Sequence, residues 1–158
     1  MITTEQYEFF QSLYEKENKR AEELMKKSQI YLSIESFVLT ALFFKVNDLQ
    51  TILSDECFLK SLYIVSISFI FLALFATVLS IKIYKYERVE KPKNVLSQFG
   101  KTAMPNGDFF LRRIVDYSVA AERNYEVNEK KARFLELSVI FIGLGFLFSL
   151  IFLIVFAL

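Results

Sequence analysis

Two carboxylates, Glu35 and Glu136, lie inside segments that otherwise carry almost no charge. A carboxyl group in apolar surroundings is unfavourable, so it usually bonds a neighbouring helix or faces water. Glu136 follows Arg133 by one turn, which allows an ion pair at a membrane interface. Glu35 lies deeper, and two roles stay open for it. It can hydrogen-bond another helix, or it can line the water-filled lumen of an oligomer.

Further polar residues accompany Glu35 in the same segment. Ser33, Ser36 and Thr40 recur at a spacing of three and four residues, so they share one side of a helix. Such a stripe is typical of helix association in a bilayer or of a pore lining. The candidate pore or interhelical residues are therefore Glu35, Ser36, Thr40 and Glu136.

The sequence offers no catalytic or metal-binding constellation. It has no histidine, which removes the commonest general base and metal ligand. Its one cysteine, Cys57, can form neither an intramolecular disulfide nor a thiolate metal site alone. There is also no Ser/His/Asp set and no dinucleotide fingerprint. We therefore expect no enzyme, no metal, no cofactor and no nucleic-acid partner.

The elements that must position these residues are long apolar helices. Hydrophobic residues make up 54% of the chain, above the 45–50% typical of soluble domains, and they occur in blocks. Residues 61–81 carry no charge, and residues 134–158 carry only Glu136. Because about 20 helical residues cross the hydrocarbon core, both segments predict transmembrane spans.

A third span is predicted at residues 28–44. This segment has 17 residues and contains Glu35, so by itself it also fits a buried soluble helix. Its position before two longer spans, with Lys26, Lys27 and Lys45 at its ends, favours a span.

Lysine and arginine near the span ends predict the orientation. Residues 1–27 hold five basic residues and residues 82–133 hold twelve, whereas residues 45–60 hold two basic and three acidic residues. Basic loops stay in the cytoplasm. We therefore expect the N-terminus and the 82–133 segment inside the cell, and the 45–60 loop and the C-terminus at the external face of the inner membrane.

Apolar residues continue outside the spans at helical spacing. The N-terminal seam is Tyr7, Phe10, Tyr14, Ala21, Leu24, Ser28 and Tyr31, and the second seam is Phe110, Ile114, Tyr117, Ala121, Asn128 and Leu135. These patterns predict amphipathic cytoplasmic helices at 1–27 and 108–133 that run into the first and third spans. The fold class is therefore an all-α integral membrane protein with three transmembrane helices. The seams can pair within one chain, or between chains in a coiled-coil homo-oligomer, which we favour.

The connector at residues 82–107 is the least helical segment. Its basic residues can serve orientation and attraction to anionic lipid headgroups, or they can form an anion or nucleotide site. The candidate anion or lipid contacts are Lys91, Lys93, Lys101, Arg112 and Arg113. Gly100-Lys101-Thr102 lacks the upstream glycine and the strand of a phosphate-binding loop.

Two short patterns resemble a known group of proteins. Tyr14-x3-Asn18-Lys19-Arg20-Ala21 precedes the first span, and Asn128-x-Lys130-Lys131-Ala132 precedes the last. The arrangement, mainly over residues 7–82, resembles the small SLATT-type and Pycsar-type transmembrane effectors of bacterial antiphage defence. The resemblance implies an oligomer that breaches the inner membrane on a signal. This chain differs by its C-terminal third span and by having no separate ligand-binding domain, so sensing would fall to a partner protein.

Three functional hypotheses follow. The leading one is a membrane effector that permeabilises the bilayer when an input, from a partner protein or a nucleotide signal, reaches its cytoplasmic helices. The second is a constitutive scaffold or accessory subunit that recruits a cytoplasmic partner without permeabilising anything. The third is a small ion channel, which would give selective flux without toxicity.

Overall fold

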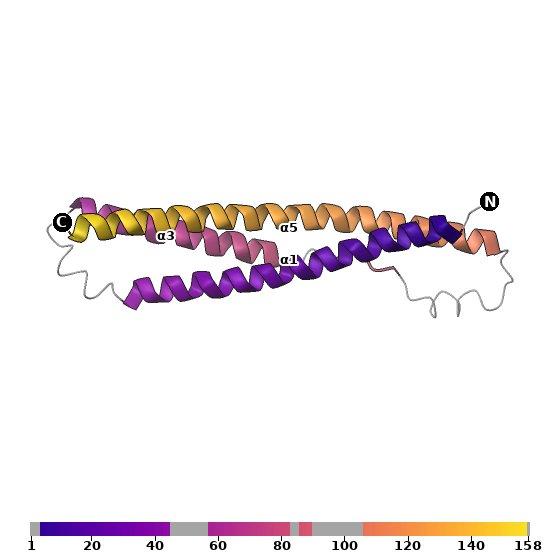
Figure 1. Cartoon of the computed structure of the whole chain (residues 1–158), viewed down its shortest axis with the longest axis horizontal. Helices are drawn as coiled ribbons and strands as arrows, with labels where there is room; N and C mark the ends of the chain where they lie inside the picture. The colour runs from indigo at the N-terminus through magenta and orange to yellow at the C-terminus, as the bar shows by residue number, and fades with distance from the viewer. Residues whose placement is uncertain (1–3, 45–56, 83–85, 90–105, 158) are drawn as a thin grey trace. The chain divides into compact units, whose positions relative to one another are not determined.

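The computed structural model describes residues 4–44, 57–82, 86–89 and 106–157, and nearly all of them are helical. Its helices are α1 (Thr4–Phe44), α3 (Cys57–Ile81) and α5 (Asn106–Ala157), drawn in Figure 1. Within these ranges no strand occurs, and residues 86–89 form a short non-helical segment. Most of the expected external loop and most of the connector lie outside the described residues.

The length of α1 follows from its sequence. Its 41 residues contain neither glycine nor proline, so nothing interrupts the backbone hydrogen-bond ladder. α5 is longer still, with 52 residues, although it contains Gly107, Gly143 and Gly145. In both helices the first part of the sequence is polar and the second part is apolar.

Two of the three helices, α3 and α5, are long and apolar enough to cross a membrane. α3 begins at Cys57, four residues before the predicted span. α5 begins at Asn106 instead of Asp108, the start that the sequence suggested. A span at residues 28–44 of α1 stays a prediction.

The chain divides into two compact units, which we describe separately. The polar unit comprises Met1–Leu24 and Tyr84–Glu129. The apolar unit comprises Met25–Ile83 and Lys130–Leu158, so it contains the second part of α1, all of α3 and the second part of α5. The candidate pore residues therefore all belong to the apolar unit.

In the apolar unit α3 runs beside the second half of α5 (Figure 1). The close approach is made at small residues: the Ser66 hydroxyl donates to the Gly145 carbonyl (3.0 Å) and lies 2.5 Å from the Ser149 hydroxyl. The Gly145-xxx-Ser149 pattern is thus a packing site, as small residues are in membrane helices. About one turn closer to the C-terminal end of α5, Phe152 packs against Tyr63 of α3. The Tyr63 hydroxyl donates its proton to the Leu42 carbonyl of α1.

The two glycines of the apolar unit should respond oppositely to alanine. A Cβ at Gly145 would lie 2.7 Å from Cγ1 of Ile70, which is buried, whereas a Cβ at Gly143 would meet nothing within 4 Å. We expect Gly145→Ala to lower the free energy of unfolding by about 1–3 kcal/mol through overpacking. Gly143→Ala should raise the free energy of unfolding by up to about 1 kcal/mol, because alanine restricts the backbone of the unfolded chain. Denaturation by sodium dodecyl sulfate, followed by circular dichroism, measures both. A loss at Gly143 equal to that at Gly145 would contradict the packing.

Aromatic rings join α1 to α5 in the polar unit. Tyr7 makes edge contacts with Phe110 and Tyr117, with ring centroids 5.4 and 5.8 Å apart, and Tyr14 lies 5.6 Å from Tyr117. Such pairs contribute about 0.5–1.5 kcal/mol each beyond burial. Farther along α5, Ala120 is buried in the same unit. The two seams thus pair within one chain in this unit.

Candidate functional site

The polar residues of the apolar unit gather around Glu35, whose side chain is 1% exposed. Its Oε1 accepts hydrogen bonds from the hydroxyls of Thr77 (2.8 Å) and Ser138 (2.6 Å). The two hydroxyl oxygens lie 2.9 Å apart. Because each residue comes from a different helix, this carboxyl–hydroxyl cluster of Glu35, Thr77 and Ser138 links α1, α3 and α5.

Helical spacing explains why these residues meet in the interior. On α1 the buried residues of this unit are Ser28, Glu35 and Leu39, which are seven and four residues apart. That spacing keeps them on one face of the helix. Thr77 follows Ala73 by one turn on the buried face of α3. Glu35 is therefore placed inside by its position on the seam, although its chemistry favours water.

A second polar layer lies two turns from Glu35. The hydroxyls of Ser28 and Ser80 are 2.9 Å apart, and Ser80 donates to the Thr77 carbonyl at 2.7 Å. All three residues are nearly fully buried. Together with the carboxyl–hydroxyl cluster they form a polar core inside an apolar unit.

The polar core is incompletely bonded. The second carboxyl oxygen of Glu35, Oε2, is buried and makes no hydrogen bond with any described residue. Leaving a buried polar atom unsatisfied costs about 1–3 kcal/mol. The described residues also contain no group of three His, Cys, Asp or Glu side chains that could hold a metal ion. The polar core can hold the helices together by hydrogen bonds, and its oxygen atoms can contact water or ions.

The other candidate pore residues lie elsewhere. Ser36, Thr40 and Glu136 are all exposed. Thr40 donates its hydroxyl proton to the Ser36 carbonyl, 2.8 Å away, so its own helix satisfies it. The structure thus separates Glu35 from the polar stripe beside it and joins it to Thr77 and Ser138 instead. The sequence had not singled out Thr77.

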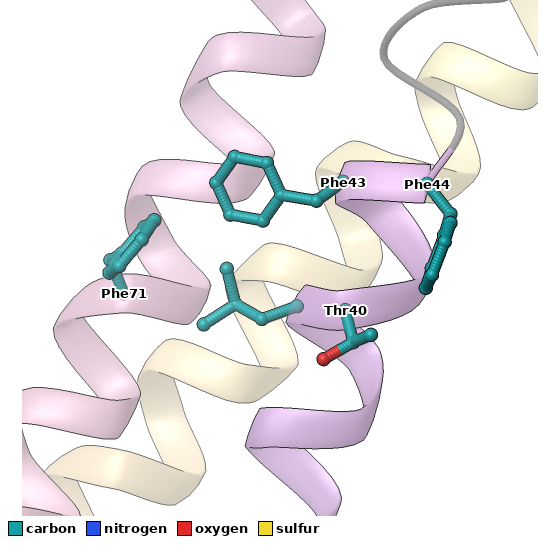
Figure 2. A pocket seen from close by; sticks show the side chains of 5 residues that line it. Thr40, Phe43, Phe44 and Phe71 are labelled. Carbon is teal, nitrogen blue, oxygen red and sulfur yellow. The ribbon is translucent and has the colours of Figure 1, made fainter.

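A shallow recess of about 380 Å³ lies near the end of α1. Figure 2 shows Phe43 and Phe71 directed from α1 and α3 toward it, and their ring centroids are 6.1 Å apart. Its lining is apolar except for Thr40: Leu39, Thr40, Phe43, Phe44 and Phe71. None of the described residues in its wall is charged, so they offer no contact for an anion or a nucleotide.

The candidate anion contacts are only partly described. Arg112 is exposed, whereas Arg113 is 2% exposed and lies over the ring of Tyr117, with its guanidinium carbon 5.2 Å from the centroid. The two neighbouring arginines therefore have different surroundings. Lys91, Lys93 and Lys101 lie outside the described residues.

An asparagine pair in the polar unit holds the segment that follows α3. Asn124 accepts a hydrogen bond from the Glu87 amide (3.0 Å) and donates one to the Glu87 carbonyl (3.2 Å). Asn128 accepts from the Tyr86 hydroxyl (2.8 Å) and donates to the carbonyl and carboxylate oxygens of Glu17 on α1, both at 2.9 Å. Both asparagines are fully buried. This amide clamp fixes the start of the connector between α1 and α5.

Sequence reasoning placed Asn128 on the second seam but assigned it no role. A signal was present, since Asn124 and Asn128 are four residues apart and therefore share a helix face. Asn18 of α1, which belongs to the resemblance pattern, also meets the clamp through Asn124, at 3.4 Å. Two amides on an otherwise apolar seam indicate a polar partner between the helices.

Two hydrogen-bond donors of the polar unit, Tyr86 and Arg20, have raised pKa values, which keeps them protonated. Burial, reinforced by the nearby Glu17, raises the pKa of Tyr86, so its hydroxyl remains a donor to Asn128. A 2.6 Å hydrogen bond to Glu129 raises the pKa of Arg20. This pair is about one-third exposed, so its contribution to stability is small.

Comparison of the chain with protein families, curated proteins and solved structures finds no match to any of them.

Proposed function

We propose that this chain is an oligomeric effector that spans the bacterial inner membrane three times and permeabilises it when an input reaches its cytoplasmic helices. α3 and α5 supply two spans, and residues 28–44 of α1 supply the third. Support for the third span comes from the packing of α1 in the apolar unit, where Glu35 bonds both other helices. The excess of basic residues in 1–27 and 82–133 supports a cytoplasmic polar unit.

The carboxyl–hydroxyl cluster is the observation that carries this proposal. Three apolar helices enclose a carboxyl group, and a core of leucines would be the simpler way to hold them together. Polar groups kept inside a membrane usually mark an ion or water path. In the resting chain the helices shield the cluster from lipid. When the helices rearrange, the same oxygen atoms become the wall of an aqueous lumen.

The exposed polar stripe supports assembly from several copies. Ser36 and Thr40 are exposed on the part of α1 proposed to cross the bilayer. Lipid gives the Ser36 hydroxyl no hydrogen-bond partner, whereas a neighbouring helix does. A second copy of α1 is therefore the expected neighbour. The resemblance to antiphage effectors agrees with such an assembly and suggests the setting, in which a partner protein or a nucleotide signal supplies the input.

Membrane potential in bacteria that express the chain tests the proposal. With a voltage-sensitive dye, we expect the activated wild-type chain to depolarise the cells. Glu35→Leu should abolish the depolarisation, because it removes the carboxyl group of the carboxyl–hydroxyl cluster and keeps a side chain of similar size. Glu23→Leu is the matched control, since Glu23 is an exposed glutamate of α1 in the polar unit. Activation would come from the genes adjacent to this one.

The remaining outcomes discriminate the other hypotheses. Unchanged potential with the neighbouring genes present would contradict a pore and leave a scaffold. Selective flux without growth arrest would indicate an ion channel. Depolarisation that persists in Glu35→Leu would show that Glu35 does not line the lumen.

A further inference from the structure

The hydrogen bonds of the apolar unit fix which residues lie at the same level on its three helices. Glu35 of α1 bonds Ser138 of α5, and seven residues earlier on each helix come Ser28 and Lys131, both 2% exposed. Seven residues are about two turns, or roughly 10 Å, on both helices. Ser28 in turn contacts Ser80 of α3. The three helices are therefore in register where α1 enters the unit.

Five exposed basic residues lie at this level, and we call them the basic belt. Lys26 and Lys27 lie on α1, Lys82 directly follows the last residue of α3, and Lys130 and Arg133 lie on α5. Lys131 lies inside the belt, where burial lowers its pKa. Glu136, one turn farther along α5 than Arg133, is the nearest exposed acidic residue of the unit on that helix.

The opposite end of the unit differs in charge. Among its described residues, only Lys60 is charged there, since α1 ends at Phe44 and α5 has no charge after Glu136. Between the two ends the surface is mostly apolar, with exposed side chains such as Ile34, Phe71 and Ile140. A bilayer would cover that apolar surface and bring the belt to the depth of the lipid headgroups.

We propose that the basic belt is a binding surface for anionic phospholipid headgroups, which it gathers around the chain. This inference rests on the proposed membrane insertion and adds a partner to it. Each basic residue near an anionic membrane surface raises the affinity for that surface by a factor of about five. The five belt residues lie on or directly after three helices, so bound headgroups also tie α1, α3 and α5 together at one end.

The absence of tryptophan from the chain permits a direct measurement. Ile30→Trp places one fluorescent reporter beside the belt, because Ile30 is 57% exposed and lies one turn from Lys26 and Lys27. The chain is reconstituted in phosphatidylcholine vesicles that contain an equal small fraction of brominated phosphatidylglycerol or brominated phosphatidylcholine. We expect the brominated phosphatidylglycerol to quench the reporter more strongly.

Two matched variants locate the preference. Lys26→Gln with Lys27→Gln should weaken the phosphatidylglycerol preference by about fivefold for each side chain removed. Lys16→Gln with Lys19→Gln removes the same charge from exposed positions of α1 in the polar unit and should leave the preference unchanged. A reporter at the other end of the unit, Phe58→Trp, should show no preference.

Equal quenching of the Ile30→Trp reporter by the two lipids would overturn the proposal. Loss of the preference when inorganic phosphate is added, but not when chloride of the same ionic strength is added, would also overturn it, because the belt would then bind free phosphate in place of lipid. The quenching needs no permeabilisation. A chain that depolarises cells but shows no lipid preference would therefore refute the belt alone.

Discussion

Thr77→Val combined with Ser138→Ala is expected to lower the free energy of unfolding of the apolar unit by about 3 kcal/mol. These substitutions remove both hydrogen bonds to Oε1 of Glu35, whose Oε2 has no hydrogen-bond partner among the described residues. A hydrogen bond between membrane helices contributes up to about 1.7 kcal/mol, and a stranded buried polar group adds about 1–3 kcal/mol. Titration with sodium dodecyl sulfate, followed by circular dichroism, measures the loss.

A third substitution separates the cost of the stranded carboxyl group from the loss of packing. Adding Glu35→Leu to the pair should restore most of the stability, since exchanging all members of a buried polar set for apolar ones is often neutral. Ser61→Ala with Ser68→Ala is the control, because these exposed hydroxyls of α3 bond only carbonyls of their own helix. If the triple variant is no more stable than the double variant, the carboxyl–hydroxyl cluster is not the source of the loss.

Asn124→Ala is expected to destabilise the polar unit by about 2 kcal/mol and to release the segment that follows α3. The substitution leaves the Glu87 amide and carbonyl without their amide partners in a part-buried position. Amide hydrogen exchange at Glu87 should become faster, as local opening becomes easier. Mass spectrometry of peptides that contain Glu87 measures this exchange.

Glu126→Ala is the matched control for Asn124→Ala. Glu126 lies on the same stretch of α5, but its side chain is exposed. Its removal should therefore change the free energy of unfolding by no more than about 0.5 kcal/mol and leave the exchange at Glu87 unchanged. Unaltered exchange at Glu87 in Asn124→Ala would show that the amide clamp does not hold the segment.

Composition and spacing predicted the all-helical structure well. The absence of glycine and proline before Pro92 predicted the continuity of α1, and the long apolar runs predicted α3 and the second half of α5. Both signals are local, because an uninterrupted helix and an apolar run depend on neighbours in the sequence. The starts of α3 and α5 differed by a few residues, as helix ends depend on weak capping preferences.

The partners of Glu35 could not be predicted in the same way. Periodicity placed Glu35 beside Ser36 and Thr40, but which face of α1 turns inward depends on how three helices rotate against one another. Thr77 and Ser138 are 42 and 103 residues away in the chain. α3 has five serine and threonine residues from Ser61 to Ser80, and the apolar part of α5 has Ser138 and Ser149. They look alike in sequence, and only packing selects Thr77 and Ser138.

The same separation along the chain constrains how the protein is made. Glu35 leaves the ribosome 103 residues before Ser138, which takes roughly 5 to 20 s at 5–20 residues per second. During that interval the carboxyl group has no intramolecular partner on α5. On the proposed three-span topology, residues 28–44 should therefore wait at the insertion machinery, or at the membrane surface, until the last helix arrives. Biosynthesis of this chain would then depend on a late step in which three helices enter the bilayer together.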